Sequence, residues 1–287
     1  MKIAIFADIH SNYQVFNKAI EDIKEYVNHF VFLGDFVTDG FEGNEVIELV
    51  KTLNHDAVSG NRDLIVFDCQ DEATLDWTEF PNLASLKFSA GCLHQESLNY
   101  LKSLEQLKIK TFMEKKICIF HGTPYNINDT SLVPENEALM DQIIADYDCD
   151  IYLFGHTHFS FHKFYRNRHF INPGSLGFNF GIQEKNPHPY KYGILTIEDG
   201  VIEFQSINVS YDYDKIYDHY INSDYYNYAK EWCDLLLLGL RDSTNHPVSM
   251  LAKVIEKAKV NNIDISRRIP KELFMEVFDE YIEMNRL

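Results

Sequence analysis

Two pairs of polar side chains at alternate positions are the first sign of chemistry in this sequence. His156 and His158 stand in the stretch FGHTHFS (154–160), and Asp8 and His10 follow the first apolar run. In an extended segment, residues i and i+2 project to the same side, so each pair could aim two donor atoms into one cavity. A histidine pair alone fits a polar turn equally well, because 12 histidines in 287 residues make chance pairs common. The metal interpretation therefore depends on other residues.

The other candidates share one position, since each directly follows a strand-like apolar run. We expect strands over 2–8, 29–35, 56–61, 115–122 and 149–158, with helices over 13–26, 44–53 and 134–147 between them. This alternation is typical of βαβ units in a mostly parallel sheet. Ligands bind at the carboxyl ends of the strands in such a sheet. The residues gathered there would be Asp8, His10, Asp35, Asn61, His121, His156 and His158.

The donor atoms of this set are carboxylate oxygens, an amide oxygen and imidazole nitrogens, with no thiolate. Such a set favours Mn, Fe, Zn or Co over a soft-metal site. Asp35 is the most isolated acid among them, which makes it the candidate to bridge two ions.

The later sequence changes in pattern. Region 71–108 is mixed and is expected to be mainly helical. Two hairpins follow the parallel units, over 161–174 with a turn near Asn167 and over 192–209 with Asp199-Gly200 as its turn. From 211 to 287 the chain is helical, so we expect a domain over 1–210 and a helical extension over 211–287 packed on it. Tyrosines in 211–228 would either pack these helices or stack on a nucleobase.

Composition limits the partners. The 26 basic and 44 acidic residues give a formal charge of −18, which disfavours broad nucleic-acid binding. A phosphate-containing substrate would then need a local positive centre. No apolar run approaches the ~20 residues that span a bilayer, so we expect no membrane partner. Five scattered cysteines without a CxxC motif indicate reduced thiols and a cytoplasmic location. Homo-oligomerisation stays open.

Five short motifs occur in an order that resembles the calcineurin-like metallophosphoesterases. A sixth, NPGS (172–175), is similar to a block of the small bacterial and archaeal phosphodiesterase branch of that family. The resemblance covers about 1–210, and the extension is more distantly similar to bacterial members that cleave diadenosine tetraphosphate. The five motifs are DIHSN (8–12), GDFVTDG (34–40), GNRD (60–63), FHG (120–122) and GHTH (155–158).

The resemblance implies a four-layer α/β/β/α sandwich of two mixed sheets with a C-terminal helical extension. It also implies two divalent ions, Mn or Fe in the first place and Zn or Co as alternatives. A hydroxide that bridges the ions would attack the phosphorus in line. Asn61 and Arg62 would stabilise the transition state, and Asn12 and Arg62 would bind substrate. One ion would be held by Asp8, His10, Asp35 and His158, and the other by Asp35, Asn61, His121 and His156.

Arg62 departs from the family pattern, which has a histidine here as general acid in phosphatases that act on poor leaving groups. Arginine does not donate a proton near neutral pH, because its pKa exceeds ~12, but it can grip phosphate oxygens. Arg62 could instead simply pair with Asp63 or another carboxylate. We therefore expect hydrolysis of phosphodiester or nucleotide phosphoanhydride bonds, for example in dinucleoside polyphosphates. A protein or phosphomonoester phosphatase and a non-catalytic scaffold of the same fold are the alternatives.

Overall fold

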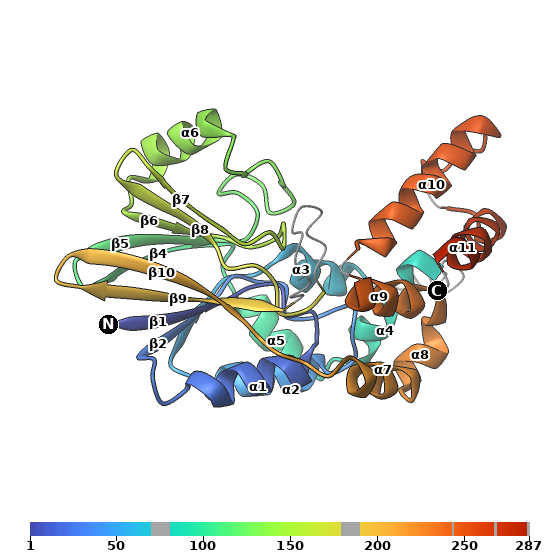
Figure 1. Ribbon diagram of the computed structural model, residues 1–287, viewed down its shortest axis with the longest axis horizontal. Coiled ribbons are helices and arrows are strands. Elements are labelled where there is room, and N and C mark those ends of the chain that lie inside the picture. The colour runs from blue at the N-terminus through green and yellow to red at the C-terminus, as the bar shows by residue number, and fades with distance from the viewer. Residues whose placement is uncertain (70–80, 179–189, 243, 267–268, 286–287) are drawn as a thin grey trace.

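Two five-stranded mixed sheets form the centre of the molecule (Figure 1). The computed structural model describes residues 1–69, 81–178, 190–242, 244–266 and 269–285. The first sheet has the order β10-β9-β1-β2-β3, with β1 Lys2–Phe6, β2 His29–Phe32, β3 His55–Ala57, β9 Lys191–Glu198 and β10 Val201–Asn208. The second has the order β4-β5-β6-β8-β7, with β4 Leu107–Phe112, β5 Lys115–Phe120, β6 Ile151–Leu153, β7 Phe161–Tyr165 and β8 Arg168–Asn172.

Alternation of side chains along the strands builds the layers. In β1, Ile3 and Ile5 face the other sheet, where Ile117 and Ile119 of β5 meet them in one buried cluster. The intervening side chains face outward. On the first sheet they pack under α1 Tyr13–Ile23, α2 Gly43–Lys51 and α5 Gln95–Ser103, and on the second under α6 Glu137–Tyr147. The expected four-layer α/β/β/α sandwich is therefore confirmed.

The two hairpins are present, but each extends a different sheet. The β9–β10 hairpin pairs with β1, while β8 of the β7–β8 hairpin pairs in parallel with β6. Both turns lie where the sequence predicts them. Asn167 and Asp199 have φ values of 59° and 50°, as two-residue hairpin turns require.

Some expected boundaries need correction. The region 71–108 holds helices α4 Pro81–Cys92 and α5, but β4 begins at its end, and residues 70–80 lie outside the described part of the chain. Helix α6 begins at Glu137 rather than at residue 134, because the Asn136 side chain accepts the backbone N–H of Leu139 and caps the helix there. The strands β2, β3 and β6 end three or more residues earlier than expected. The candidates Asp35, His156 and His158 consequently lie in the loops after β2 and β6, while Asn61 begins helix α3 Asn61–Asp68.

The C-terminal helices lie beyond the carboxyl ends of β1 and β2, and α10 projects from them (Figure 1). Their buried side chains belong to the same hydrophobic cluster as the outer face of the first sheet. The domain boundary at residue 210 stays a prediction. Within the described residues, no helix combines the length and apolar character needed to cross a bilayer. The helices are α7 Tyr213–Ile221, α8 Asp224–Tyr228, α9 Lys230–Asp242, α10 His246–Val260 and α11 Lys271–Asn285.

Candidate metal centre

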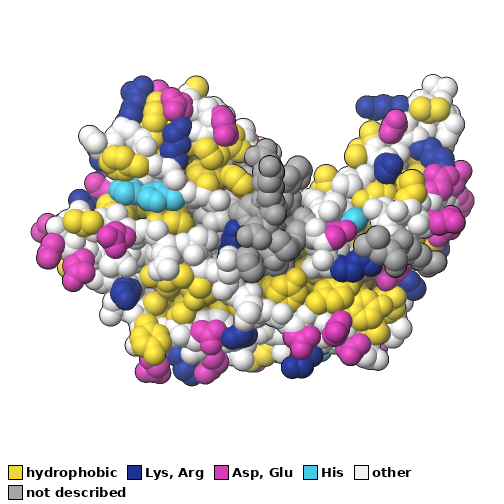
Figure 2. Space-filling view, in the orientation of Figure 1, with side chains coloured by type: hydrophobic (Ala, Val, Ile, Leu, Met, Phe, Trp, Pro, Cys, Tyr) yellow, Lys and Arg dark blue, Asp and Glu magenta, His cyan; other side chains and the backbone are white. Residues whose placement is uncertain are grey.

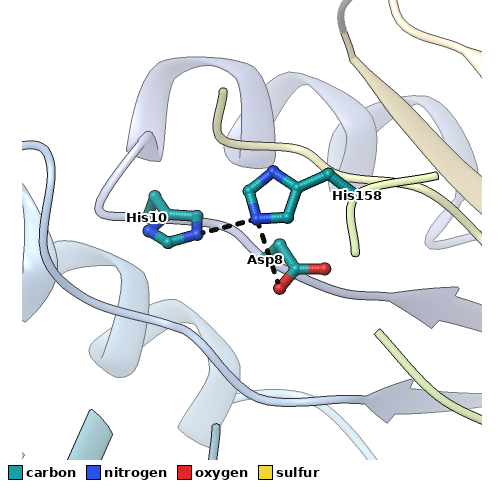
Figure 3. Close-up of side chains that lie close together, drawn as sticks. All are labelled: Asp8, His10 and His158. Carbon is teal, nitrogen blue, oxygen red and sulfur yellow. Dashed lines mark hydrogen bonds and ion pairs between the residues drawn. The ribbon is translucent and has the colours of Figure 1, made fainter. Parts of the chain in front are cut away.

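Six of the seven candidate ligands form two compact clusters at the carboxyl ends of the strands. Within each cluster the candidate donor atoms lie within 4.8 Å of one another. In the first, the imidazoles of His10 and His158 turn toward each other beside the carboxylate of Asp8 (Figure 3). The second cluster contains Asp35, His121 and His156. All are buried except His156, which is half-buried.

Asp35 belongs to the second cluster and also lies close to the first. Its Oδ2 is 3.8 Å from Nε2 of His10 in the first cluster and 3.4 Å from Nε2 of His121 in the second. The seventh candidate, Asn61, has its Oδ1 3.0 Å from the same His121 nitrogen. The seven residues therefore form one continuous donor set, with a carboxylate at the centre.

Hydrogen bonds at Nδ1 orient the imidazoles. The Nδ1–H of His121 donates to the carbonyl oxygen of Leu33 at 2.6 Å, and that of His158 donates to the carbonyl of Phe178. Nδ1 of His10 lies 3.3 Å from a carboxylate oxygen of Asp39. The hydrogen bonds of His121 and His158 each fix a tautomer in which Nε2 presents its lone pair to the donor set, as metal-binding histidines do. The contact between His10 and Asp39 has an ion-pair distance but not the geometry of a hydrogen bond.

The backbone that carries these side chains is left-handed rather than extended. Five of the seven candidates have positive φ, which costs free energy for a side-chain-bearing residue and concentrates at functional sites. Asp8 and His10, like His156 and His158, therefore reach the same site because their loops have this conformation. The expectation from sequence, that extended backbone aims each pair to one side, is wrong. The five residues are Asp8 (53°), His10 (50°), Asp35 (55°), His156 (67°) and His158 (57°).

The electrostatics of the set fit divalent cations. Burial and the neighbouring Asp35 raise the pKa of the Asp8 carboxyl to about 7. Burial alone would lower the pKa of His121, but Asp35 and Asp8 raise it to about 9. The Nε2 atoms of His10 and His158 face each other at 3.3 Å, so either a proton on one of them or a cation must separate their lone pairs. A cation between these atoms would relieve the repulsion among the lone pairs and the carboxylates.

A cavity of about 510 Å³ opens over the donor set. Figure 2 shows the molecule hollowed between the lobe that carries α6 and β7 and the projecting helix α10. Arg62 is the one lysine or arginine among the described residues of the cavity wall. Besides ligand candidates and Arg62, the wall comprises Thr130, Val133, Thr157, Asn245 and Val248.

Arg62 pairs with a carboxylate, as one of the sequence interpretations held, and also lines the cavity. Its Nη2 is 3.7 Å from Oδ2 of Asp39, and its backbone N–H donates to Oδ1 of Asp35 at 2.7 Å. Asp63 is not its partner. That carboxylate accepts the backbone N–H groups of Asp35, Phe36 and Gly60, so it holds the Asp35 loop in place.

Asn12 is engaged away from the cavity. Its side-chain oxygen caps α1 by accepting from the backbone N–H of Val15, and its Nδ2 donates to the carbonyl of Leu176 at 3.0 Å. It is not among the described residues of the cavity wall. Its substrate-binding role stays a prediction.

The tyrosines of 211–228 favour the packing interpretation. Tyr220 and Tyr225 are buried, and Tyr213, Tyr217 and Tyr226 line a separate cavity of about 280 Å³. None of the tyrosines that the structure describes in this stretch lines the cavity over the donor set.

Sequence reasoning missed Asp39 and the contributions of the extension. Asp39 is fully buried beside His10, and its signal was a second acid four residues after Asp35 in GDFVTDG. Asn245 and Val248 of the extension gave no local signal, because only the fold brings them to the cavity.

Comparison with known proteins agrees with the fold. A curated, uncharacterised protein of Methanocaldococcus jannaschii is 28% identical over 261 residues, which cover 83% of this chain and 98% of that protein. A hypothetical protein of Pyrococcus horikoshii shares the fold with a TM-score of 0.66 at 20% identity, over 82% of this chain and 97% of its own. A metallophosphoesterase of Sphaerobacter thermophilus does so with a TM-score of 0.61 at 21% identity, over 80% and 98%. Residues 1–200 match the calcineurin-like phosphoesterase superfamily domain, and this chain belongs to that superfamily.

Proposed function

We propose that this chain hydrolyses phosphodiester or nucleotide phosphoanhydride bonds, those of dinucleoside polyphosphates among them. Membership of the family supports metal-dependent phosphoester hydrolysis at a dinuclear divalent centre. The finer substrate assignment is carried by one observation. Among the described residues of the cavity wall, once the proposed ligands are set aside, Arg62 is the only ionisable side chain.

We assign the ligands as the two clusters suggest. The position of Asp35, with one oxygen within 4 Å of an imidazole of each cluster, supports its bridging role. When bound, two divalent ions, with Mn or Fe preferred over Zn or Co, would supply an activated water and neutralise phosphoryl oxygens. One ion would take Asp8, His10, Asp35 and His158, and the other Asp35, Asn61, His121 and His156.

Arg62 and Asn61 would bind the phosphate group. The guanidinium of Arg62 would hold non-bridging phosphate oxygens through its planar fork, and the amide of Asn61 would add a donor beside it. Neither group supplies a proton to the leaving group near neutral pH. A leaving group that departs as a stable anion, such as a nucleotide phosphate, needs no such proton.

The cavity wall supports a small substrate. A volume of about 510 Å³ lies within the range of small-molecule sites, roughly 300–1,000 Å³. Val133 and Val248 give it apolar surface and Thr130 gives it an uncharged polar group, which suits a nucleoside better than a charged peptide.

The test is a substrate panel with the Mn²⁺-loaded protein. It compares diadenosine tetraphosphate, bis-p-nitrophenyl phosphate, an alkyl phosphomonoester and a phosphopeptide by kcat/KM. We expect the anhydride and the activated diester to exceed the other two by at least about 100-fold, the typical value of general acid catalysis that the cavity lacks. Asp35→Asn should abolish turnover.

The matched control is Asp56→Asn, which alters a buried acid that pairs with His29 and Lys110 outside the cavity. This variant should keep its activity. A preference for the phosphopeptide or the alkyl ester would favour the phosphatase alternative. Metal binding without hydrolysis of any substrate would favour the scaffold alternative.

A further inference from the structure

Asp39 is a buried carboxylate that the proposed ligand set does not use. It is 1% exposed and lies in the loop that follows Asp35. Both Thr38 and Asp39 have left-handed backbones, with φ values of 78° and 57°. Such a conformation persists only where the surroundings hold it, so the side chain of Asp39 is fixed by specific contacts.

The two oxygens of Asp39 face in different directions. Oδ2 faces the centre, 3.3 Å from Nδ1 of His10 and 3.7 Å from Nη2 of Arg62. Oδ1 faces the helices, where it accepts the indole N–H of Trp232 at 2.9 Å and the hydroxyl of Ser85 at 3.2 Å. One carboxylate thus connects a proposed metal ligand and the cavity arginine to a tryptophan 193 residues away in α9.

Other residues of the extension pack on the same loop. The hydroxyl of Tyr225 in α8 donates to Oγ of Ser85 at 2.9 Å, which continues the hydrogen-bond chain from Asp39. A Cβ placed on Gly40 would lie 2.9 Å from the Tyr220 hydroxyl, so α7 also lies directly on this loop. The extension therefore supports the loop from its far side.

We propose that Trp232 is a positioning residue for the metal centre, which acts through Asp39 to orient His10 toward the ions and Arg62 into the cavity. The inference rests on the proposed function, because it takes His10 as a ligand and Arg62 as a phosphate group. A carboxylate on Nδ1 fixes the tautomer and ring orientation of a ligating histidine. The carboxylate can serve this purpose only while its own rotation is stopped, and the rigid indole N–H of Trp232 stops it.

The direct test is Trp232→Phe, which removes the indole N–H and keeps an aromatic side chain. Loss of such an outer partner typically costs about 10–100-fold in metal affinity. We expect the Kd for Mn²⁺, measured by equilibrium dialysis, to rise at least about 10-fold for one of two ions. KM should also rise, because Arg62 loses its anchored partner.

The matched control is Tyr211→Phe. It removes another hydrogen bond of the extension, from the Tyr211 hydroxyl to the carbonyl of Leu240 at 2.9 Å, and leaves Asp39 untouched. Its Mn²⁺ Kd should stay within about 2-fold of the wild type. An equal change in both variants, or no change in Trp232→Phe, would overturn the inference.

A double-mutant cycle tests the route through Asp39. Asp39→Asn keeps the shape of the side chain and should itself weaken Mn²⁺ binding, so it remains informative where Trp232→Phe does not fold. If Trp232 acts through Asp39, adding Trp232→Phe to Asp39→Asn should change the Kd little further. Additive losses would overturn the proposal. Coupled Kd changes in a protein without hydrolytic activity would support this inference and contradict the proposed function.

Discussion

At the scale of a single residue, Arg62 is the side chain that should determine which leaving groups the cavity accepts. It is the only lysine or arginine of the described wall, and it pairs with Asp39 beside the donor set. A fixed positive charge there stabilises developing negative charge on phosphate oxygens, but it does not share a proton with the departing group. The rate should therefore depend steeply on the acidity of the leaving group.

Arg62→His is expected to flatten that dependence. An imidazole at this position can protonate an alkoxide, which should raise the ratio of kcat/KM for an alkyl ester over an aryl ester by at least about 10-fold. The measurement is a leaving-group series of phosphate esters. Arg62→Lys, which keeps the charge but loses the planar fork, should raise KM several-fold and leave the slope unchanged. If the rate of the wild-type protein depended only weakly on the acidity of the leaving group, the interpretation that the cavity lacks a general acid would be contradicted.

Residue types at strand ends were enough to predict that the seven candidate ligands converge, because the carboxyl ends of parallel strands meet at one edge of a sheet. That they bind metal stays a prediction. His156 and His158 fell in different clusters, as the resemblance implied. The left-handed backbone at these five residues was not predicted, although Asp and His adopt positive φ several-fold more often than most side-chain-bearing residues. Asp39 was missed for another reason: its role depends on Trp232, and no local pattern reports a contact across 193 residues.

At the scale of elements, the sequence predicted the strands and helices better than their partners. The apolar patterns of β1, α1 and β5 were strong enough to predict these elements, and the Asp199-Gly200 turn was enough to predict the β9–β10 hairpin. That β9 would pair with β1 depends on a long-range register which the hairpin itself does not encode. The short alternating stretch LKIKTF of β4 was overlooked because it borders a helical region.

Helix α10 is the element through which the extension reaches the substrate cavity. Asn245 caps this helix by accepting the backbone N–H of Val248, and Val248 lines the cavity together with Thr130 and Val133. Val248 is 52% exposed, so enlarging it should cost little stability. Its size should instead decide how large a group fits beside the ions.

Val248→Trp is expected to discriminate substrates by size. We expect kcat/KM for diadenosine tetraphosphate to fall about 10-fold or more, an effect of about 1.4 kcal/mol, while that for methyl p-nitrophenyl phosphate changes less than about 3-fold. Val260→Trp is the control on the same helix, because Val260 is 74% exposed and lines a different cavity. An equal loss of kcat/KM for both substrates would indicate that the substitution disturbs the metal centre and does not act by excluding large substrates.

At the scale of the whole molecule, the chain carries a net charge of −18, and two of its carboxylates, Asp8 and Asp35, are buried in the donor set. In the absence of cations this arrangement is destabilising, and protons partly compensate. The pKa of Asp8 is raised to about 7 and that of His121 to about 9, so the folded state binds protons that the unfolded state releases. The contribution of Asp8 and His121 to the free energy of unfolding of the metal-free protein should therefore fall as pH rises from 6 to 9.

Divalent ions should restore the stability that the metal-free protein loses at high pH, and the stabilisation they give should increase with pH. Mn²⁺ at 100 times its Kd adds about 2.7 kcal/mol to the free energy of unfolding, which corresponds to roughly 5–10 °C in Tm for a chain of this size. Because the ions compete with protons at Asp8 and His121, the rise in Tm on adding Mn²⁺ to chelator-treated protein should be larger at pH 8 than at pH 6. Differential scanning calorimetry at the two pH values measures both effects. Asp35→Asn, which removes the central carboxylate, should lose most of the shift at either pH, and a wild-type shift that is equal at both would show that proton release does not accompany binding.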